Sequence, residues 1–400
     1  MKKRKINLTV VFVLVLILSN LGTYFLAVNG VFNGKNSVTV KTDSQTISSG
    51  LQKIASLEKK IQSDYYKDVD EQALMDGAIK GMFDAIGDEY SAYYTKDEYT
   101  KLMESTTGSF EGIGVVVTED GNKNTIVVTP YKDTPAGNAG IQTGDTIIKV
   151  DDEDVTGKGM DYAVSKMRGT AGTPVKVTVS RDGQEIDFNL TRDTIDTKTV
   201  DSKVLGNNIG YIEISQFTET TGEEFKEQMD NLMAQGIQGL VIDLRYNGGG
   251  LVDQSVEVAD RLLGQTEVVY TVDKQGNRKD YRATSEDQVT VPVTVLVNEG
   301  TASASEILAG AIQDTQAGTL IGTKTFGKGI VQEVISLMDG TGYKLTNAEY
   351  FTPNGRNIHS VGLTPDVEIN QNENYKDTLV VPEEQDTQLQ KALEVLQSKM

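Results

Sequence analysis

The spacing of hydrophobic positions changes along the chain and divides it into regions. Over residues 50–105 apolar residues recur at helical spacing, as at Leu51, Ile54 and Leu57. From about residue 108 short β-rich runs such as "GIGVVV" and "NTIVVTP" take over, with one helical stretch, "GMDYAVSKMRG". We therefore expect a helical segment over residues 50–105 and a small β-rich domain over residues 106–190.

After residue 190 the apolar runs become longer and alternate with amphipathic helical patterns. The strand-like runs "NIGYIEI" and "GLVIDLRYNGGG" are each followed by a helical run. This alternation is typical of layered α/β packing, and we expect such a core over residues 191–370. The tail, residues 371–400, carries an apolar stripe at Leu389, Ala392, Leu393 and Leu396. Docking of this stripe on the N-terminal helices, elsewhere within the chain or on a second subunit remains open.

The N-terminus predicts a membrane anchor over residues 1–28. Four basic residues, Lys2 to Lys5, precede an apolar run from Ile6 to Val28 that is long enough to cross a bilayer. The basic flank predicts that the N-terminus lies in the cytoplasm. The chain would then cross the cell membrane once, with everything after the anchor outside the cytoplasm. A cleaved signal peptide is the alternative. Residues 29–49 are polar and predict a linker.

Composition excludes several kinds of site. A net charge of −20, from 38 basic and 58 acidic side chains, argues against a nucleic-acid partner, because such binding uses clustered Lys and Arg. The chain has no cysteine and a single histidine, His359. This removes disulfides, thiolate metal sites, a cysteine nucleophile and any site that needs two imidazoles.

The strand-like run "VPVTVLV" ends at Val297. The stretch "VNEGTASASEILAGAIQD", residues 297–314, then places Ser303 near the start of a predicted helix. The amide of Ala304 is then free to donate, and the helix dipole favours developing negative charge. Upstream, Gly248, Gly249 and Gly250 follow a predicted buried strand and can point amide groups at a ligand. An ordinary helix cap at Ser303 and an ordinary turn at the glycines are the alternatives.

A serine nucleophile needs a base, and Lys328 is the candidate. It lies between Gly327 and Gly329, just before an apolar strand-like run. Burial of an ammonium lowers its pKa toward the range of a general base, so a Ser–Lys pair removes the need for histidine. A solvated loop lysine is the alternative.

Four blocks, "VIDLRYNGGG", "NEGTASASEILAGAIQD", "GTKTFGKGIVQ" and "YFTPNGRNIHSVGLTPDV", resemble in order and spacing the carboxyl-terminal processing peptidases, or tail-specific proteases. The resemblance implies a ClpP/crotonase-like α/β core in which Ser303 is the nucleophile and Lys328 the base. It further implies that Gln332 orients the lysine, and that the amides of Ala304 and of Gly248 or Gly249 form the oxyanion hole. No cofactor or metal is implied.

The same resemblance makes residues 106–190 a PDZ domain. The edge that begins Gly112, Ile113, Gly114, Val115 would bind a peptide by strand addition and hold its terminal carboxylate. The implied substrates are therefore polypeptides with apolar C-terminal tails, and Arg168 is the candidate residue that couples their capture to the active site. The helical ends allow a homodimer or a monomer. Glu89 departs from the proline common at its position, and His359 lies at a variable one.

Two other interpretations concern function. The chain would be a tethered peptide-binding scaffold if its protease core were catalytically silent, an alternative that the joint presence of Ser303, Lys328 and Gln332 opposes. The run "SLEK", Ser56 to Lys59, matches the S-x-x-K of penicillin-recognising enzymes but lacks their other motifs.

Overall fold

The structure is a computed structural model, and it describes residues 45–286, 288–375 and 381–400. The chain divides into two units, residues 1–78 and 79–400. No helix in the described ranges is long and apolar enough to span a membrane. The anchor expected at residues 1–28 and most of the linker expected at residues 29–49 lie outside those ranges, so both stay predictions.

The expected helical segment consists of helices and one short strand. Helix α4 begins after Thr95, whose amide donates to the Glu98 carboxylate at 2.8 Å, and it ends at Gly108 in the left-handed conformation, where φ is 74°. The apolar side chains of α2 at Leu51 and Leu57 are 60% and 54% exposed. The elements are α2 (Gln45–Asp64), α3 (Glu71–Asp84), β1 (Ala92–Tyr94) and α4 (Lys96–Thr107).

The small β-rich domain has one six-stranded sheet, in which β3, β4, β5, β7 and β8 follow one another and β6 pairs with β5. Its core is built on alternate residues of these strands, such as Val175, Val177 and Val179 of β7. A separate pair, β2 and β9, brings the chain into and out of the domain side by side. The elements are β2 (Ser109–Gly112), β3 (Val115–Glu119), β4 (Thr125–Pro130), α5 (Pro135–Ala139), β5 (Thr146–Val150), β6 (Glu153–Asp154), α6 (Met160–Met167), β7 (Pro174–Arg181), β8 (Gln184–Thr191) and β9 (Asp193–Asp196).

The α/β core contains a six-stranded sheet of order β10-β11-β12-β15-β16-β19, parallel except for the antiparallel edge strand β10. Strands β12 and β15 are buried along their whole length, as their continuous apolar sequence predicts. The strands are β10 (Val200–Leu205), β11 (Ile209–Ile214), β12 (Gly239–Asp243), β15 (Val293–Val297), β16 (Thr319–Gly322) and β19 (Val367–Glu368), with a 3₁₀ turn at Gly206–Asn208.

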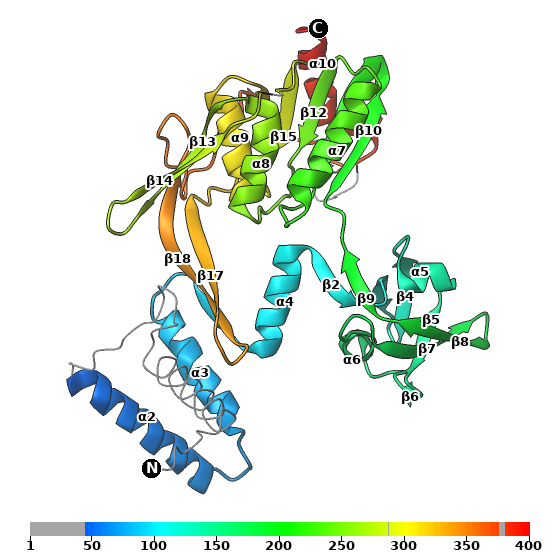
Figure 1. The fold of residues 1–400 in the computed structure, drawn as a ribbon, viewed down its shortest axis with the longest axis vertical. Helices are drawn as coiled ribbons and strands as arrows, with labels where there is room; N and C mark the ends of the chain where they lie inside the picture. The colour runs from blue at the N-terminus through cyan, green and yellow to red at the C-terminus, as the bar shows by residue number, and fades with distance from the viewer. Residues whose placement is uncertain (1–44, 287, 376–380) are drawn as a thin grey trace, which may run out of the picture. The chain divides into compact units, whose positions relative to one another are not determined.

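Alternate residues of these strands face opposite layers of helices. Leu240 and Ile242 belong to the core shared with α7, α8 and α9, whereas Val241 belongs to the core shared with α10. Figure 1 shows α7 and α8 on one side of the sheet and the C-terminal α10 on the other. The tail stripe therefore docks within the chain. The helices are α7 (Thr221–Ala234), α8 (Val252–Leu263), α9 (Ala304–Asp314) and α10 (Thr387–Gln397).

A second, antiparallel sheet has the order β1-β18-β13-β14, with β17 also paired to β18. Because β1 pairs with β18, the segment before α4 is tied to a strand more than 240 residues later, with Ala92 opposite Lys344. The remaining strands are β13 (Thr266–Asp273), β14 (Arg278–Ala283), β17 (Ile330–Ser336) and β18 (Gly342–Phe351).

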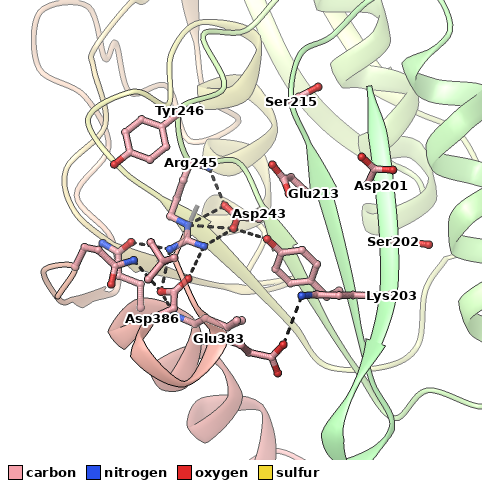
Figure 2. Close-up of a pocket in the computed structure, with 15 residues that line it drawn as sticks. Asp201, Ser202, Lys203, Glu213, Ser215, Asp243, Arg245, Tyr246, Glu383 and Asp386 are labelled. Atoms are coloured by element: carbon pink, nitrogen blue, oxygen red, sulfur yellow. Dashed lines mark hydrogen bonds and ion pairs between the residues drawn. The ribbon is translucent and has the colours of Figure 1, made fainter. Parts of the chain in front are cut away.

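An ion cluster joins the C-terminal helix to the loop that follows β12. The guanidinium of Arg245 donates to Asp243 and, at 2.8 Å, to Asp386, whose carboxylate also caps α10 by accepting from the Leu389 amide. Figure 2 shows these groups on the wall of a pocket of about 520 Å³. The side chains of Arg245, Asp243 and Asp386 are 12%, 6% and 4% exposed. They are thus largely removed from water and paired with one another.

We predict that Asp386→Ala lowers the free energy of unfolding by about 3 kcal/mol, because it leaves Arg245 short of a buried counter-ion and removes the α10 cap. Urea unfolding of the full chain measures this. Glu383→Ala is the matched control: the pair of Glu383 with Lys203 is exposed, 44% and 53%, and its loss should change stability by less than about 1 kcal/mol. Equal effects of the two substitutions would contradict the prediction.

Candidate active site

The predicted nucleophile lies where two parallel strands end. Strands β12 and β15 run side by side, with Asp243 opposite Leu296, so the loops after them share one edge of the sheet. The buried hydroxyl of Thr301 joins these loops by donating to the carbonyl of Leu244 at 2.8 Å. Ser303 is the residue just before α9. The strand-to-helix turn expected from the sequence is therefore present.

The backbone of Ser303 is strained. Its φ and ψ are 57° and −117°, a combination that residues with a Cβ rarely adopt. Such an outlier persists only where surrounding structure enforces it, and functional sites are where this happens most. Here the carbonyl of Ser303 accepts from the hydroxyl of fully buried Tyr350 at 3.1 Å. An ordinary helix cap does not require this conformation, so the strain favours a functional role.

The glycine run packs directly against the serine. A Cβ added to Gly249, whose φ is 100°, would lie 2.9 Å from the Cβ of Ser303 and 2.7 Å from the carbonyl oxygen of Ala302. Only glycine fits this approach. The loop is held by Asn247, a fully buried side chain that donates to the Ile214 carbonyl at 2.7 Å. The run is therefore more than a turn.

The three candidate oxyanion donors differ in what they bind. The Gly249 amide donates to the side-chain oxygen of Asn247 at 2.9 Å and is therefore occupied. Within the described part of the chain, the Gly248 amide has no hydrogen-bond partner. Ala304 opens α9, so its amide has no acceptor in its own helix. Gly248 and Ala304 are the stronger pair, and the choice between Gly248 and Gly249 was open from the sequence.

Lys328 is half-buried in the loop before β17. Burial lowers the pKa of its ammonium from 10.5, the charge of Lys344 lowers it further, and the carboxylates of Asp88 and Glu89 oppose the shift. The Nζ atom lies 4.5 Å from the centre of the Tyr90 ring. A half-buried lysine with a lowered pKa is better suited to act as a general base than a solvated lysine is.

A buried carboxylate connects the serine to the lysine. The Oε2 atom of Glu306, which is fully buried, accepts from the Ser303 amide at 3.0 Å and from the Lys328 amide at 2.8 Å. The two nitrogens can therefore be no further apart than the sum of these distances. Its Oε1 atom accepts from the Gly327 amide at 2.8 Å and from the Thr325 hydroxyl at 2.5 Å. Glu306 was missed from the sequence, although "SASE" carries the serine-x-x-glutamate signature of a capping box.

Gln332 lies on β17, and its side chain is hydrogen-bonded to a residue other than Lys328. Its side-chain amide donates to the Thr346 hydroxyl on β18 at 3.3 Å. In the described ranges no hydrogen bond joins the side chain of Lys328 to that of Gln332 or of Ser303. Hydrogen bonds of catalytic groups are often long or absent before substrate binds, so the orienting role of Gln332 stays a prediction.

The predicted peptide-binding edge is an exposed edge of its sheet. Strand β3, which starts at Val115, pairs only with β4 on its path. Ahead of it, Ile113 is buried and Gly114 has a φ of 80°, with the Thr134 side chain where a Cβ would point. Gly112 ends β2. The geometry fits strand addition on β3.

Arg168 lies at the C-terminal end of α6. Its guanidinium forms an ion pair with Glu104 of α4 and lies 5.4 Å from the Phe110 ring. These residues line a pocket of about 480 Å³ together with Val164 and Asp161. The predicted coupling residue of the small domain thus contacts the helix that follows β1.

Two further residues that the sequence singled out, Ser56 and His359, also lie in the described ranges. The hydroxyl of Ser56, from the S-x-x-K match, donates to the Gln52 carbonyl of its own helix at 2.8 Å. His359 lines a pocket of about 550 Å³ with Asp88, Glu89 and Tyr90. Over the described ranges, no three His, Asp or Glu side chains gather closely enough to hold a metal ion.

Three family models match the chain. Peptidase family S41 matches residues 208–369, the activating protease CtpB N-terminal domain matches residues 16–98, and the PDZ domain matches residues 126–181. These matches cover the core, the N-terminal region and the small β-rich domain in turn.

Similar proteins carry names that agree with these models. Carboxy-terminal processing protease CtpA of Bacillus subtilis (strain 168) is 38% identical over 91% of this chain and 77% of its own length. Carboxy-terminal processing protease CtpB of the same organism is 36% identical over 83% and 70%. The solved photosystem II D1 C-terminal processing protease is 31% identical, with a TM-score of 0.48 over 83% of this chain and 89% of that one. The chain belongs to the carboxy-terminal processing proteases of peptidase family S41 and is a serine endopeptidase with a PDZ domain.

Proposed function

We propose that Ser303 is the nucleophile of this protease, that Lys328 is its general base, and that the PDZ domain delivers substrates by their C-terminal tails. The observation that carries the proposal is the hydrogen bonding of the Ser303 and Lys328 amides to one oxygen of Glu306. It ties the backbones of the two residues together even though 24 residues separate them in the sequence. A scaffold with a silent core has no need of this arrangement.

The proposed reaction begins with neutral Lys328. Its Nζ lone pair takes the proton of the Ser303 hydroxyl while the serine oxygen attacks the peptide carbonyl. The amides of Gly248 and Ala304 donate to the carbonyl oxygen as it becomes negative. The lysine then gives its proton to the leaving amine, which breaks the peptide bond and leaves an acyl group on Ser303. A water molecule, deprotonated by the same lysine, then attacks the acyl carbonyl. The bond to the Ser303 oxygen breaks as the lysine returns the proton to that oxygen, which releases the acid product and restores the hydroxyl.

The N-terminal region supports a proposal about where the protease acts and whether it dimerises. The basic flank and apolar run at residues 1–28 support a single-pass anchor that holds the catalytic part outside the cytoplasm. The exposed apolar side chains of α2 support self-association into a homodimer. Protease added to intact cells should degrade the core if the location is right, and sedimentation of the purified chain should give a dimer if the association is right.

The second part of the proposal is that the PDZ domain selects substrates and controls the active arrangement of the catalytic residues. Strand addition on β3 would leave the terminal carboxylate of a tail near the Gly112–Gly114 turn. The Arg168–Glu104 ion pair connects this domain to α4. Helix α4 follows β1, and β1 pairs with β18. On its other side β18 pairs with β17, which carries Gln332. We propose that tail binding alters this connection and so favours the active arrangement of Lys328. Binding can shift that equilibrium only by the difference in tail affinity between the two states.

We predict that Ser303→Ala and Lys328→Ala each reduce peptide cleavage by at least about 10³-fold, while circular dichroism and peptide binding stay unchanged. Because the base is an amine with a lowered pKa, kcat/KM of the wild type should rise with pH, to half its maximum below pH 10.5. Steady-state cleavage from pH 5 to 10 measures both. Ordinary turnover in either variant, or a rate that climbs on acidification, would exclude the dyad.

Glu306→Gln tests the connection between the two residues in the same assay. The amide keeps the shape and two acceptor lone pairs but brings donors toward amides that already donate. We expect kcat to fall about 10- to 100-fold with little change in KM, since the residue positions groups and does not bind substrate. Glu299→Gln is the control and should behave as wild type, because this exposed side chain accepts a hydrogen bond from Thr323 and lies outside the Glu306 network.

A two-by-two experiment tests the PDZ proposal. A substrate whose C-terminal carboxylate is amidated should bind several-fold more weakly than the free acid, because a charge-assisted contact to backbone amides is lost. Arg168→Ala should lower turnover of the free acid more than its binding, and should have little further effect on the amidated peptide. Fluorescence anisotropy and cleavage rates give the four values. Equal binding of both peptides would rule out terminal capture.

A further inference from the structure

One contact of the proposed base is not explained by the mechanism above. The ammonium of Lys328 lies over the face of the Tyr90 ring, with Nζ 4.5 Å from the ring centre. A cation over an aromatic face is attracted to the negative π surface, and the attraction strengthens as water is excluded. Lys328 and Tyr90 are both partly buried. The ring therefore stabilises the protonated lysine, which is the form that cannot accept a proton.

Tyr90 is held in place by a chain of hydrogen bonds. Its amide donates to Asp88 at 3.1 Å, and the Ser91 hydroxyl donates to the same carboxylate at 2.6 Å. The Ser91 hydroxyl in turn accepts from the Thr346 amide of β18 at 3.0 Å. Thr346 is also the residue whose hydroxyl accepts from Gln332. The ring thus has a fixed position relative to β18, and Gln332 ends on the same network.

Charged and titratable groups of several elements surround Lys328 and Tyr90. Asp88 and Glu89 lie in the loop that carries Tyr90, and Lys344 lies on β18. Glu306 of α9 acts on Tyr90 itself, and His359 lines the adjoining pocket. Burial, followed by the hydrogen bond and charge of Glu89, raises the pKa of the Tyr90 phenol. The pKa of the Tyr90 phenol is raised and that of the Lys328 ammonium is lowered, and these opposite shifts favour a neutral ring beneath the cation.

We propose that Tyr90 is a positioning residue of the reaction, whose ring face holds the ammonium form of Lys328 in a fixed place. The proposal rests on the role proposed for Lys328. The ammonium forms each time the lysine removes a proton, first from Ser303 and then from water. The ring therefore has two effects: it raises the pH at which the base becomes available, and it stabilises the cation that each proton transfer creates.

Tyr90→Leu and Tyr90→Phe separate the ring from the hydroxyl. Tyr90→Leu keeps an apolar side chain but removes the π surface, so the acid limb of kcat/KM should move down by roughly 0.5 to 1 pH unit. The plateau of kcat above that limb should fall several-fold with little change in KM, because the lysine loses a fixed partner. Tyr90→Phe keeps the ring face and should retain the wild-type profile. A merely structural role of Tyr90 would not move the acid limb.

A measurement without turnover guards against loss of activity for other reasons. In full-length Ser303→Ala, labelled with ¹³C-lysine and assigned with Lys328→Arg, NMR titration reports the pKa of Lys328 directly. Adding Tyr90→Leu should lower this pKa by the same amount as the acid limb, and adding Tyr90→Phe should not. Glu89→Gln removes one charge but leaves the ring, and should lower the pKa by a smaller amount.

The outcomes distinguish the two proposals. If Lys328→Ala is inactive but Tyr90→Leu leaves both the acid limb and the Lys328 titration unchanged, the positioning role of Tyr90 is wrong and the proposed dyad stands. If Tyr90→Phe shifts both as Tyr90→Leu does, the hydroxyl rather than the ring acts, and the proposal is overturned. If Lys328→Ala remains active, both proposals fail. Matching downward shifts for Tyr90→Leu alone support the ring.

Discussion

The carboxylate of Glu306 is the interaction on which the rest of the site depends. It is fully buried and accepts hydrogen bonds from three backbone amides and one hydroxyl, those of Ser303, Gly327, Lys328 and Thr325. A carboxylate taken out of water without such donors would be strongly disfavoured. The loop before β17 must therefore fold against the start of α9. The position of Lys328 relative to Ser303 follows from the hydrogen bonding of a residue that takes no part in the chemistry.

A second constraint acts from the other side of the serine. The buried Asn247 organises the glycine loop, and Gly249 approaches Ser303 so closely that no side chain fits between them. Ser303 is thus packed between this loop and the Glu306 network. These contacts hold it in a backbone conformation that residues with a Cβ rarely adopt. The buried core supports this strain, since Tyr350 and the helices on both faces of the sheet fix the surroundings.

The sequence predicted the parts of this arrangement that depend on local pattern. Buried parallel strands read as continuous apolar runs, so β12 and β15 and the turns that follow them could be placed, and with them Ser303 and the glycines. The tail stripe at Leu389 and Leu396 was visible, but three docking partners remained open until the structure placed it on the core sheet. An apolar stripe predicts that one face of a helix is buried, but it does not predict which surface covers that face.

What the sequence could not provide depends on contacts between distant segments. Glu306 contacts Thr325, and Ser91 contacts Thr346, because the fold brings distant segments together. No pattern in the local sequence predicts either contact. The same holds for Tyr90, which no local pattern in the sequence singled out. Gln332 was assigned by resemblance to orient Lys328, yet its amide contacts Thr346 in this state.

The most direct test of the account is to trap the acyl group that it places on Ser303. An ester substrate mixed rapidly with the enzyme, quenched in acid and analysed by mass spectrometry should give one adduct, and peptide mapping should locate it on Ser303. The account predicts no adduct in Ser303→Ala and formation slowed by at least about 10³-fold in Lys328→Ala. An adduct on another residue, or one that forms at the wild-type rate without Lys328, would contradict the account.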